Sequence, residues 1–266
     1  AKTVASITQL YDRERSWLEA YYGERWDFDT KRLYKYNNQA LVRGFTMFSY
    51  HSLYYTTRAG WWEHAPGDPH FRQPYWDFTL SQGKYVERMS WLLSQGKHRC
   101  DVALLDPTAT IQIDPLFPSP GEGPLGCIAQ ETLYAVMNSI YEAGIDFDVI
   151  DAQSMARATV KDGRLAVSGG EYKVVILPAM SAVHYETMEK LHEFYRDGGM
   201  VAAVEWLPSV SDRVGAEDEK LDAMVREVFG ETGKSPDAVI EQSVRNKTGF
   251  SLKPYWIWNP GDKIAN

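Results

Sequence analysis

The sequence predicts an α/β protein made of two regions, and three observations support this prediction. Short apolar runs typical of strands alternate with amphipathic helices along most of the 266 residues. Aromatic residues are concentrated before residue 92, where six of the nine Trp and ten of the sixteen Tyr occur. After residue 100 the runs become aliphatic, as in buried parallel strands. We therefore expect a boundary near residue 98 that separates regions 1–98 and 99–266.

The first region has the order helix, strand, helix, strand, long loop, helix. Asp27 and Asp29 are suited to cap the second helix, and Gly44 to end it. The last helix is expected to bury an apolar face. Two βα units of this kind are typical of the end of a (β/α)₈ barrel, which needs eight. The elements are helices over 1–14, 27–44 and 75–95, strands over 15–20 and 45–51, and a loop over 56–74; the last helix's predicted face is Tyr75, Phe78, Tyr85, Met89 and Leu92.

The second region alternates strands with helices, which predicts a flavodoxin-like, doubly wound parallel sheet. An Asp-Gly pair between alternating residues predicts a hairpin over 158–167. The C-terminal run 255–258 is a further candidate strand that packs back on the body. The other elements are strands over 100–106, 147–150, 172–178 and 200–205, and helices ending near Gly144 or lying over 185–197 and 217–229.

Composition excludes several classes of protein. A net charge of -8 argues against general nucleic-acid binding, which needs clustered Lys and Arg. No run of eighteen apolar residues and no signal peptide is present, so we expect a soluble protein with no membrane partner and leave its compartment open. The start at Ala1 is compatible with an excised fragment. Cys100 and Cys127 are too few for a disulfide framework, and we expect both to be buried as small apolar residues.

Glu19 is the strongest catalytic candidate. It ends a short apolar run, and two tyrosines, Gly23 and Trp26 follow it. Glycoside hydrolases use a pair of carboxyl groups, and aromatic rings stack on the sugar. The alternative is an ordinary surface or ion-paired Glu at a strand end. If Glu19 is catalytic, its partner carboxyl lies outside this chain.

Aromatic residues and histidines around the strand ends predict a sugar-binding site. His51 ends the second strand, where it is placed to bind a sugar hydroxyl or orient the acid; the alternative is a buried His that binds a backbone carbonyl. The loop after it carries tandem Trp, which either form a sugar-stacking wall or plug the barrel end. The predicted binding residues are Tyr22, Trp26, His51, Trp61, Trp62 and His64.

We expect no metal or nucleotide site from the residues alone. Glu63, His64, Asp68 and His70 match no standard zinc spacing. The G-x-G-x-x-G spacing at 121–126 falls in a Pro- and Gly-rich loop over 114–126, so we do not expect it to open a nucleotide-binding helix. No P-loop sequence is present, and the turn after the central strand at 177–183 has no nucleophile elbow. The second region is therefore expected to be structural.

Several of these segments together resemble a known family. They are the run from Glu19 to Trp26, the strand ending in His51, the helix and junction over 85–107, and the hairpin with its strand over 160–178. The chain resembles part of the family 106 α-L-rhamnosidase-like glycoside hydrolases over residues 13–205. In these enzymes a catalytic barrel precedes a flavodoxin-like domain similar to the glutamine-amidotransferase fold.

The resemblance implies that Glu19 lies on the seventh barrel strand as base or nucleophile, and His51 on the eighth in the sugar subsite. It also implies calcium in the site. The predicted function is cleavage of a glycoside, oligosaccharide or polysaccharide, with the rest of the barrel supplied by a preceding segment or another chain. Homo-oligomer formation stays open. The alternative function is a non-catalytic carbohydrate-binding or assembly module in which Glu19 is structural.

Overall fold

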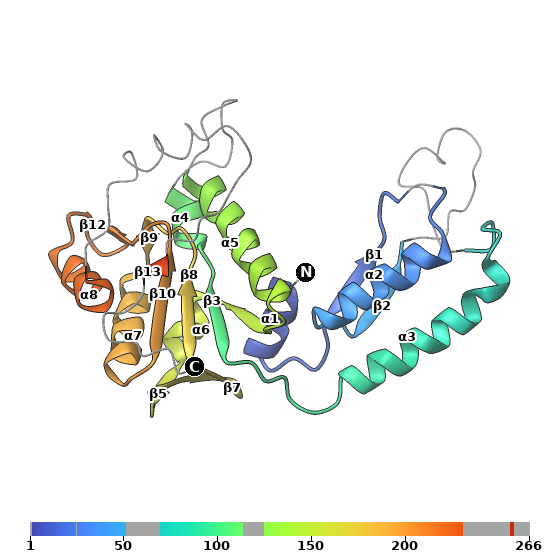
Figure 1. The fold of residues 1–266 in the computed structure, drawn as a ribbon, viewed down its shortest axis with the longest axis horizontal. Coiled ribbons are helices and arrows are strands. Elements are labelled where there is room, and N and C mark those ends of the chain that lie inside the picture. The colour runs from blue at the N-terminus through green and yellow to red at the C-terminus, as the bar shows by residue number, and fades with distance from the viewer. Residues whose placement is uncertain (1, 25, 52–69, 114–124, 231–255, 258–266) are drawn as a thin grey trace. The chain divides into compact units, whose positions relative to one another are not determined.

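The computed structural model divides into two compact units, residues 1–98 and 99–266 (Figure 1). It describes the chain except for residues 1, 25, 52–69, 114–124, 231–255 and 258–266. The fold is mixed α/β with parallel strands in both units. No helix among the described residues is long and apolar enough to cross a membrane.

The first unit is built on a parallel pair of strands, β1 (Trp17–Ala20) and β2 (Met47–Tyr50). Helix α1 (Lys2–Leu10) precedes β1, and α2 (Thr30–Val42) connects the two strands. The Asp29 carboxylate caps α2 by accepting a hydrogen bond from the Arg32 backbone N–H at 2.8 Å. Leu33, Ala40 and Leu41 of α2 are buried, as its apolar spacing predicts.

Helix α3 (Thr79–Leu93), which follows the short 3₁₀ turn η2 (Trp76–Phe78), buries a different face from the predicted one. Its buried residues are Gln82, Val86 and Ser90. Of the predicted face, Tyr75, Tyr85 and Met89 are half-buried, whereas Phe78 and Leu92 are exposed. The prediction was wrong because it followed the apolar residues. Contacts with β2 determine which side of α3 is buried, since Gln82 donates a hydrogen bond to the Tyr50 hydroxyl at 2.9 Å.

The second unit contains a sheet with the strand order β13-β10-β8-β3-β4. Four of its strands are parallel and alternate with helices along the chain. The C-terminal β13 pairs antiparallel with β10, which confirms that the candidate strand near the C-terminus packs back on this unit. The strands are β3 (Val102–Leu105), β4 (Phe147–Ile150), β8 (Val174–Leu177), β10 (Met200–Val204) and β13 (Trp256–Ile257).

Helices cover both faces of this sheet, with α5 on one side and α6 and α7 on the other (Figure 1). The apolar core under α5 combines four residues of that helix with residues from every parallel strand of the sheet. The helices are α4 (Thr108–Ile113), α5 (Leu125–Glu142), α6 (Ala152–Arg157), α7 (Tyr185–Arg196) and α8 (Glu219–Phe229); the core members are Leu104, Leu133, Val136, Met137, Ile140, Phe147, Val149, Ile176, Ala202 and Val204.

Two small sheets complete the second unit. The predicted hairpin forms from β5 (Thr159–Lys161) and β6 (Arg164–Val167), and its turn residues Asp162 and Gly163 both have positive φ, at 53° and 67°. Strand β7 (Gly170–Tyr172) extends this hairpin, so the predicted central strand over 172–178 is divided between two sheets. The other small sheet has the strands β9 (Ala182–Val183), β11 (Val210–Ser211) and β12 (Gly215–Ala216).

The two cysteines differ from expectation. Both are free thiols, and both are half-buried instead of fully buried. Cys100 precedes β3, and its thiol donates a hydrogen bond to the Asp148 carboxylate, a polar contact that the sequence did not predict.

Asp218 stabilises the start of α8 through several contacts. Its carboxylate accepts hydrogen bonds from the backbone N–H of Lys220 at 3.1 Å and Leu221 at 3.3 Å, and from the Ser211 hydroxyl at 2.6 Å. Arg213 donates two further bonds, and this guanidinium is the main reason that the pKa of Asp218 falls from 3.8 to about 2. The folded state therefore favours the ionised form of the Asp218 carboxyl group.

Asp218→Asn is expected to lower the melting temperature at neutral pH, because it removes the charge that Arg213 binds. A carboxyl whose pKa is lowered by folding contributes stability above its unfolded pKa and loses it as the pH falls through the folded pKa. The difference from the unmodified protein should therefore shrink between about pH 4 and pH 2. Circular-dichroism melting across this range measures it, with Glu219→Gln in the same turn as the control. A difference that does not depend on pH would contradict the assignment.

Candidate functional site at the ends of the parallel strands

Glu19 lies on the open face of the β1–β2 pair. Side chains alternate along a strand, and in β1 Ala20 is buried while Trp17 and Glu19 are exposed. Residues paired in register point to the same face, and Glu19 pairs with Ser49. Ser49 is exposed as well. One face of the pair is thus packed within the unit, and the other carries Glu19 one residue before the carboxyl end of β1.

Tyr22 and His51 lie together just beyond the strand ends. Their rings meet edge to face with centroids 4.9 Å apart. The Tyr22 side chain is 60% exposed, and the His51 backbone N–H donates to the Ala20 carbonyl at 2.5 Å. The His51 Nδ1 atom is buried and has no hydrogen-bond partner among the described residues. The structure therefore brings together two of the predicted sugar-binding residues, although the His51 Nδ1 atom itself is not exposed.

Trp26 packs against a histidine that the sequence did not single out for this role. The ring of Trp26 meets that of His70 edge to face at 6.4 Å. His70 is buried, and its Nδ1 accepts the backbone N–H of Arg72 at 3.0 Å. His70 thus supports an aromatic side chain, whereas sequence reasoning weighed it only as a metal ligand. Nothing in its spacing signals this contact.

Several predicted residues lie outside the described part of the chain. These are the sugar-stacking candidates Trp61, Trp62 and His64, and the rejected metal-ligand candidates Glu63, His64 and Asp68. Their roles remain predictions.

A polar cluster centred on Asn37 adjoins the carboxyl ends of β1 and β2. The Asn37 Oδ1 atom accepts hydrogen bonds from the hydroxyls of Tyr21 at 2.6 Å and Tyr50 at 3.1 Å. Burial is the largest factor raising the pKa of both tyrosines, so both hydroxyls stay neutral donors. Sequence reasoning missed Asn37, although its spacing from Leu33 and Leu41 places it on the apolar side of α2.

A hollow along the described part of the first unit does not coincide with this site. It has a volume of about 850 Å³ and lies along α3, and its described lining includes Arg15, Lys84 and Trp91. None of the predicted sugar-binding residues is among the described residues that line it.

The carboxyl edge of the second sheet holds one unusual acid. Glu205 directly follows β10, has a left-handed backbone with φ of 66°, and is half-buried. Burial raises the pKa of its carboxyl group. Ligands of open α/β sheets bind at this edge, but a hollow among the described residues of this unit lies elsewhere, along α7.

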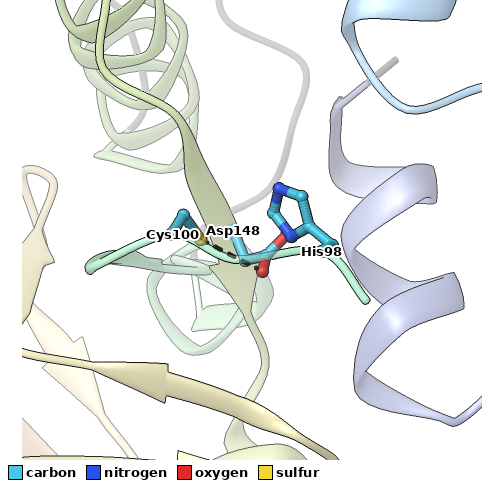
Figure 2. A group of neighbouring side chains, drawn as sticks. All are labelled: His98, Cys100 and Asp148. Carbon is cyan, nitrogen blue, oxygen red and sulfur yellow. Dashed lines mark hydrogen bonds between the residues drawn. The ribbon is translucent and has the colours of Figure 1, made fainter. Parts of the chain in front are cut away.

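A buried polar cluster connects Asp148 of β4 with Tyr172 of β7 and with Cys100, which precedes β3. The Asp148 carboxylate is 2% exposed and accepts hydrogen bonds from the Tyr172 hydroxyl at 3.0 Å and the Cys100 thiol at 3.4 Å. Figure 2 shows the Cys100–Asp148 bond and also labels His98, the last residue of the first unit. Because the three side chains belong to two units, we assign no metal to them.

Comparison with known proteins identifies the family. The pattern of the alpha-L-rhamnosidase family, glycoside hydrolase family 106, matches residues 1–249. The chain belongs to this family. A curated relative from Formosa agariphila, described as a putative beta-glucuronidase, is 25% identical over 210 residues, which is 75% of this chain and 16% of the relative. The chain thus spans about a sixth of that protein.

Solved structures show the same fold at low identity. A rhamnosidase from Novosphingobium sp. PP1Y superposes with a TM-score of 0.53 at 17% identity, over 85% of this chain and 21% of that one. A GH42 beta-galactosidase from G. stearothermophilus superposes with a TM-score of 0.54 at 19% identity, over 73% of this chain and 26% of that one. Both likenesses concern the fold, and both neighbours are much longer than this chain.

Tyr172→Phe is expected to lower the free energy of unfolding by about 1–3 kcal/mol, because it removes a hydroxyl donor from a buried carboxylate. Urea unfolding measures the effect. Tyr195→Phe is the control, since it makes the same chemical change at a half-buried tyrosine of α7. Equal losses in the two variants would show that the Asp148 bond is not the cause.

Proposed function

We propose that the chain supplies one catalytic carboxylate, Glu19, to a barrel-type glycoside hydrolase. The observation that carries the proposal is the position of Glu19 on the open face of two parallel strands, one residue from the carboxyl end. In (β/α)₈ enzymes the active site lies at the carboxyl ends of the strands. Membership in glycoside hydrolase family 106 supports the same reaction class.

In this proposal residues 1–98 form the last two βα units of the barrel, and residues 99–266 a flavodoxin-like accessory domain. The open face of β1 and β2 is then the side that faces the barrel interior. The remaining strands come from a preceding segment or another chain, consistent with the small share of each relative that this chain covers. The second catalytic carboxyl is expected there.

Glu19 acts as base or nucleophile in this arrangement. If the partner carboxyl is about 5–5.5 Å away, Glu19 attacks the anomeric carbon; at about 6.5–9.5 Å it activates a water. The partner protonates the glycosidic oxygen in both cases. In this proposal Tyr22 contacts the sugar through its exposed ring, and His51 lines the same subsite beside that ring. Trp26, Trp61, Trp62 and His64 belong to the same proposed subsite.

Calcium, which the family resemblance implies, does not fit the two strands by themselves. Calcium takes six to eight oxygen ligands, often several of them carboxylates. Residues 17–20 and 47–50 contain a single acid, Glu19. The proposed reaction therefore uses no metal-bound step.

Glu19→Gln in the complete protein is expected to lower kcat by about 10²–10⁴-fold, because the amide neither attacks nor accepts a proton. Sugar affinity should change little, since the amide keeps the size of the carboxylate and one of its two acceptor oxygens. Turnover is measured on nitrophenyl α-L-rhamnoside, β-D-glucuronide and β-D-galactoside, and binding by calorimetry. Glu24→Gln, a nearby half-buried acid outside the strand, is the control. Near-normal turnover in Glu19→Gln would refute the proposal; sugar binding without hydrolysis in the unmodified protein would favour a carbohydrate-binding module.

Tyr22→Ala is expected to raise KM by roughly 2- to 12-fold, because one aromatic contact contributes about 0.5–1.5 kcal/mol. The change in kcat should be smaller, as the ring is not proposed to take part in bond breaking. Tyr134→Ala, at a similarly exposed tyrosine of α5, should leave both constants unchanged. An unchanged KM in Tyr22→Ala would remove this residue from the subsite.

A further inference from the structure

The buried amide of Asn37 joins the carboxyl ends of both strands to α2. Tyr21 immediately follows β1 and Tyr50 is the last residue of β2, and both donate their hydroxyls to Asn37 Oδ1. The two rings are close, with centroids 6.1 Å apart. Asn37 itself has no exposed surface.

A second helix extends this network. The Gln82 amide of α3 donates to the Tyr50 hydroxyl at 2.9 Å, and the Gln82 side chain is 3% exposed. Hydrogen bonds in a buried region therefore connect the ends of β1 and β2 with the helices α2 and α3. The Asn37 Nδ2 atom is buried without a hydrogen-bond partner among the described residues, so the connection rests on Asn37 Oδ1 and the Tyr50 hydroxyl. Hydrogen bonds are directional, so these three bonds restrain the segments that they connect.

We propose that Asn37 is a positioning residue for Glu19 and His51. This inference rests on the proposed function of Glu19. Tyr21 lies two residues after Glu19 along the backbone, and Tyr50 directly precedes His51. Fixing both tyrosines fixes the backbone that carries the acid and the histidine. Catalysis depends steeply on such placement, because a shift of about 1 Å costs about 10²-fold in rate.

The next residue on the helix offers a matched control. Asn38 is exposed, and its Oδ1 accepts the hydroxyl of Tyr85 from α3 at 2.5 Å. This pair has the same chemistry as the Asn37 cluster, but it does not involve a strand end. Asn38→Leu and Tyr85→Phe therefore repeat the substitutions of the cluster without touching the proposed site.

The experiment compares kcat and KM in the complete protein, on the nitrophenyl glycoside that the unmodified enzyme cleaves. Tyr21→Phe and Tyr50→Phe each remove one bond to Asn37, and Asn37→Leu removes both. We expect kcat to fall at least about tenfold in each, with KM within about twofold, since the backbone under the reacting groups loosens while sugar contacts remain. Asn37→Asp, which keeps the acceptor oxygen, should recover part of kcat. The control variants should keep both constants.

The outcomes separate the inference from the proposed function. If Glu19→Gln keeps normal turnover, both are overturned. If Glu19→Gln is inactive but both Tyr→Phe variants keep kcat within about twofold of the unmodified enzyme, only the positioning role fails. Equal loss of kcat in Tyr85→Phe also overturns it, because the effect is then one of general packing. The Tyr→Phe variants keep the test decisive even if Asn37→Leu does not fold.

Discussion

The parallel pairing of β1 with β2 is the constraint on which the candidate site depends. Its register sets Glu19 opposite Ser49 and brings the residues after each strand to the same end. A shift by one residue would turn Glu19 toward the packed face and Ala20 toward the open one. Burial of Ser16 and Ala20 opposes such a shift, because it would leave a carboxylate inside the unit.

Each unit also contains a buried polar acceptor that connects its own elements. In the first unit Asn37 receives two tyrosine hydroxyls, and in the second the Asp148 carboxylate receives a tyrosine hydroxyl and a thiol. In both, a buried acceptor selects particular partners from neighbouring elements. Apolar packing alone is less selective, since hydrophobic contacts have no direction.

Sequence reasoning recovered the elements better than their faces. The helix capped by Asp29, the hairpin at Asp162-Gly163 and the parallel strands were predicted from local signals, and each is present. The prediction missed the most buried residues of α3, because Gln82 is buried where it bonds Tyr50 while the apolar Leu92 stays exposed. At the site, Tyr22 and His51 meet because each follows the end of a predicted strand. The packing of Trp26 on His70 and the bonds of Asn37 to Tyr21 and Tyr50 were not predicted.

By itself the sequence determined what depends on neighbours along the chain: the alternation of strands and helices, the turn residues, the concentration of aromatic residues and the position of Glu19 at the end of an apolar run. The tertiary structure decided which side of each element is buried and which polar atoms meet. Residues 21, 37, 50 and 82 share one network although they lie far apart in sequence. Hydrogen bonds between distant residues depend on the fold that brings them together, and local patterns do not encode that proximity.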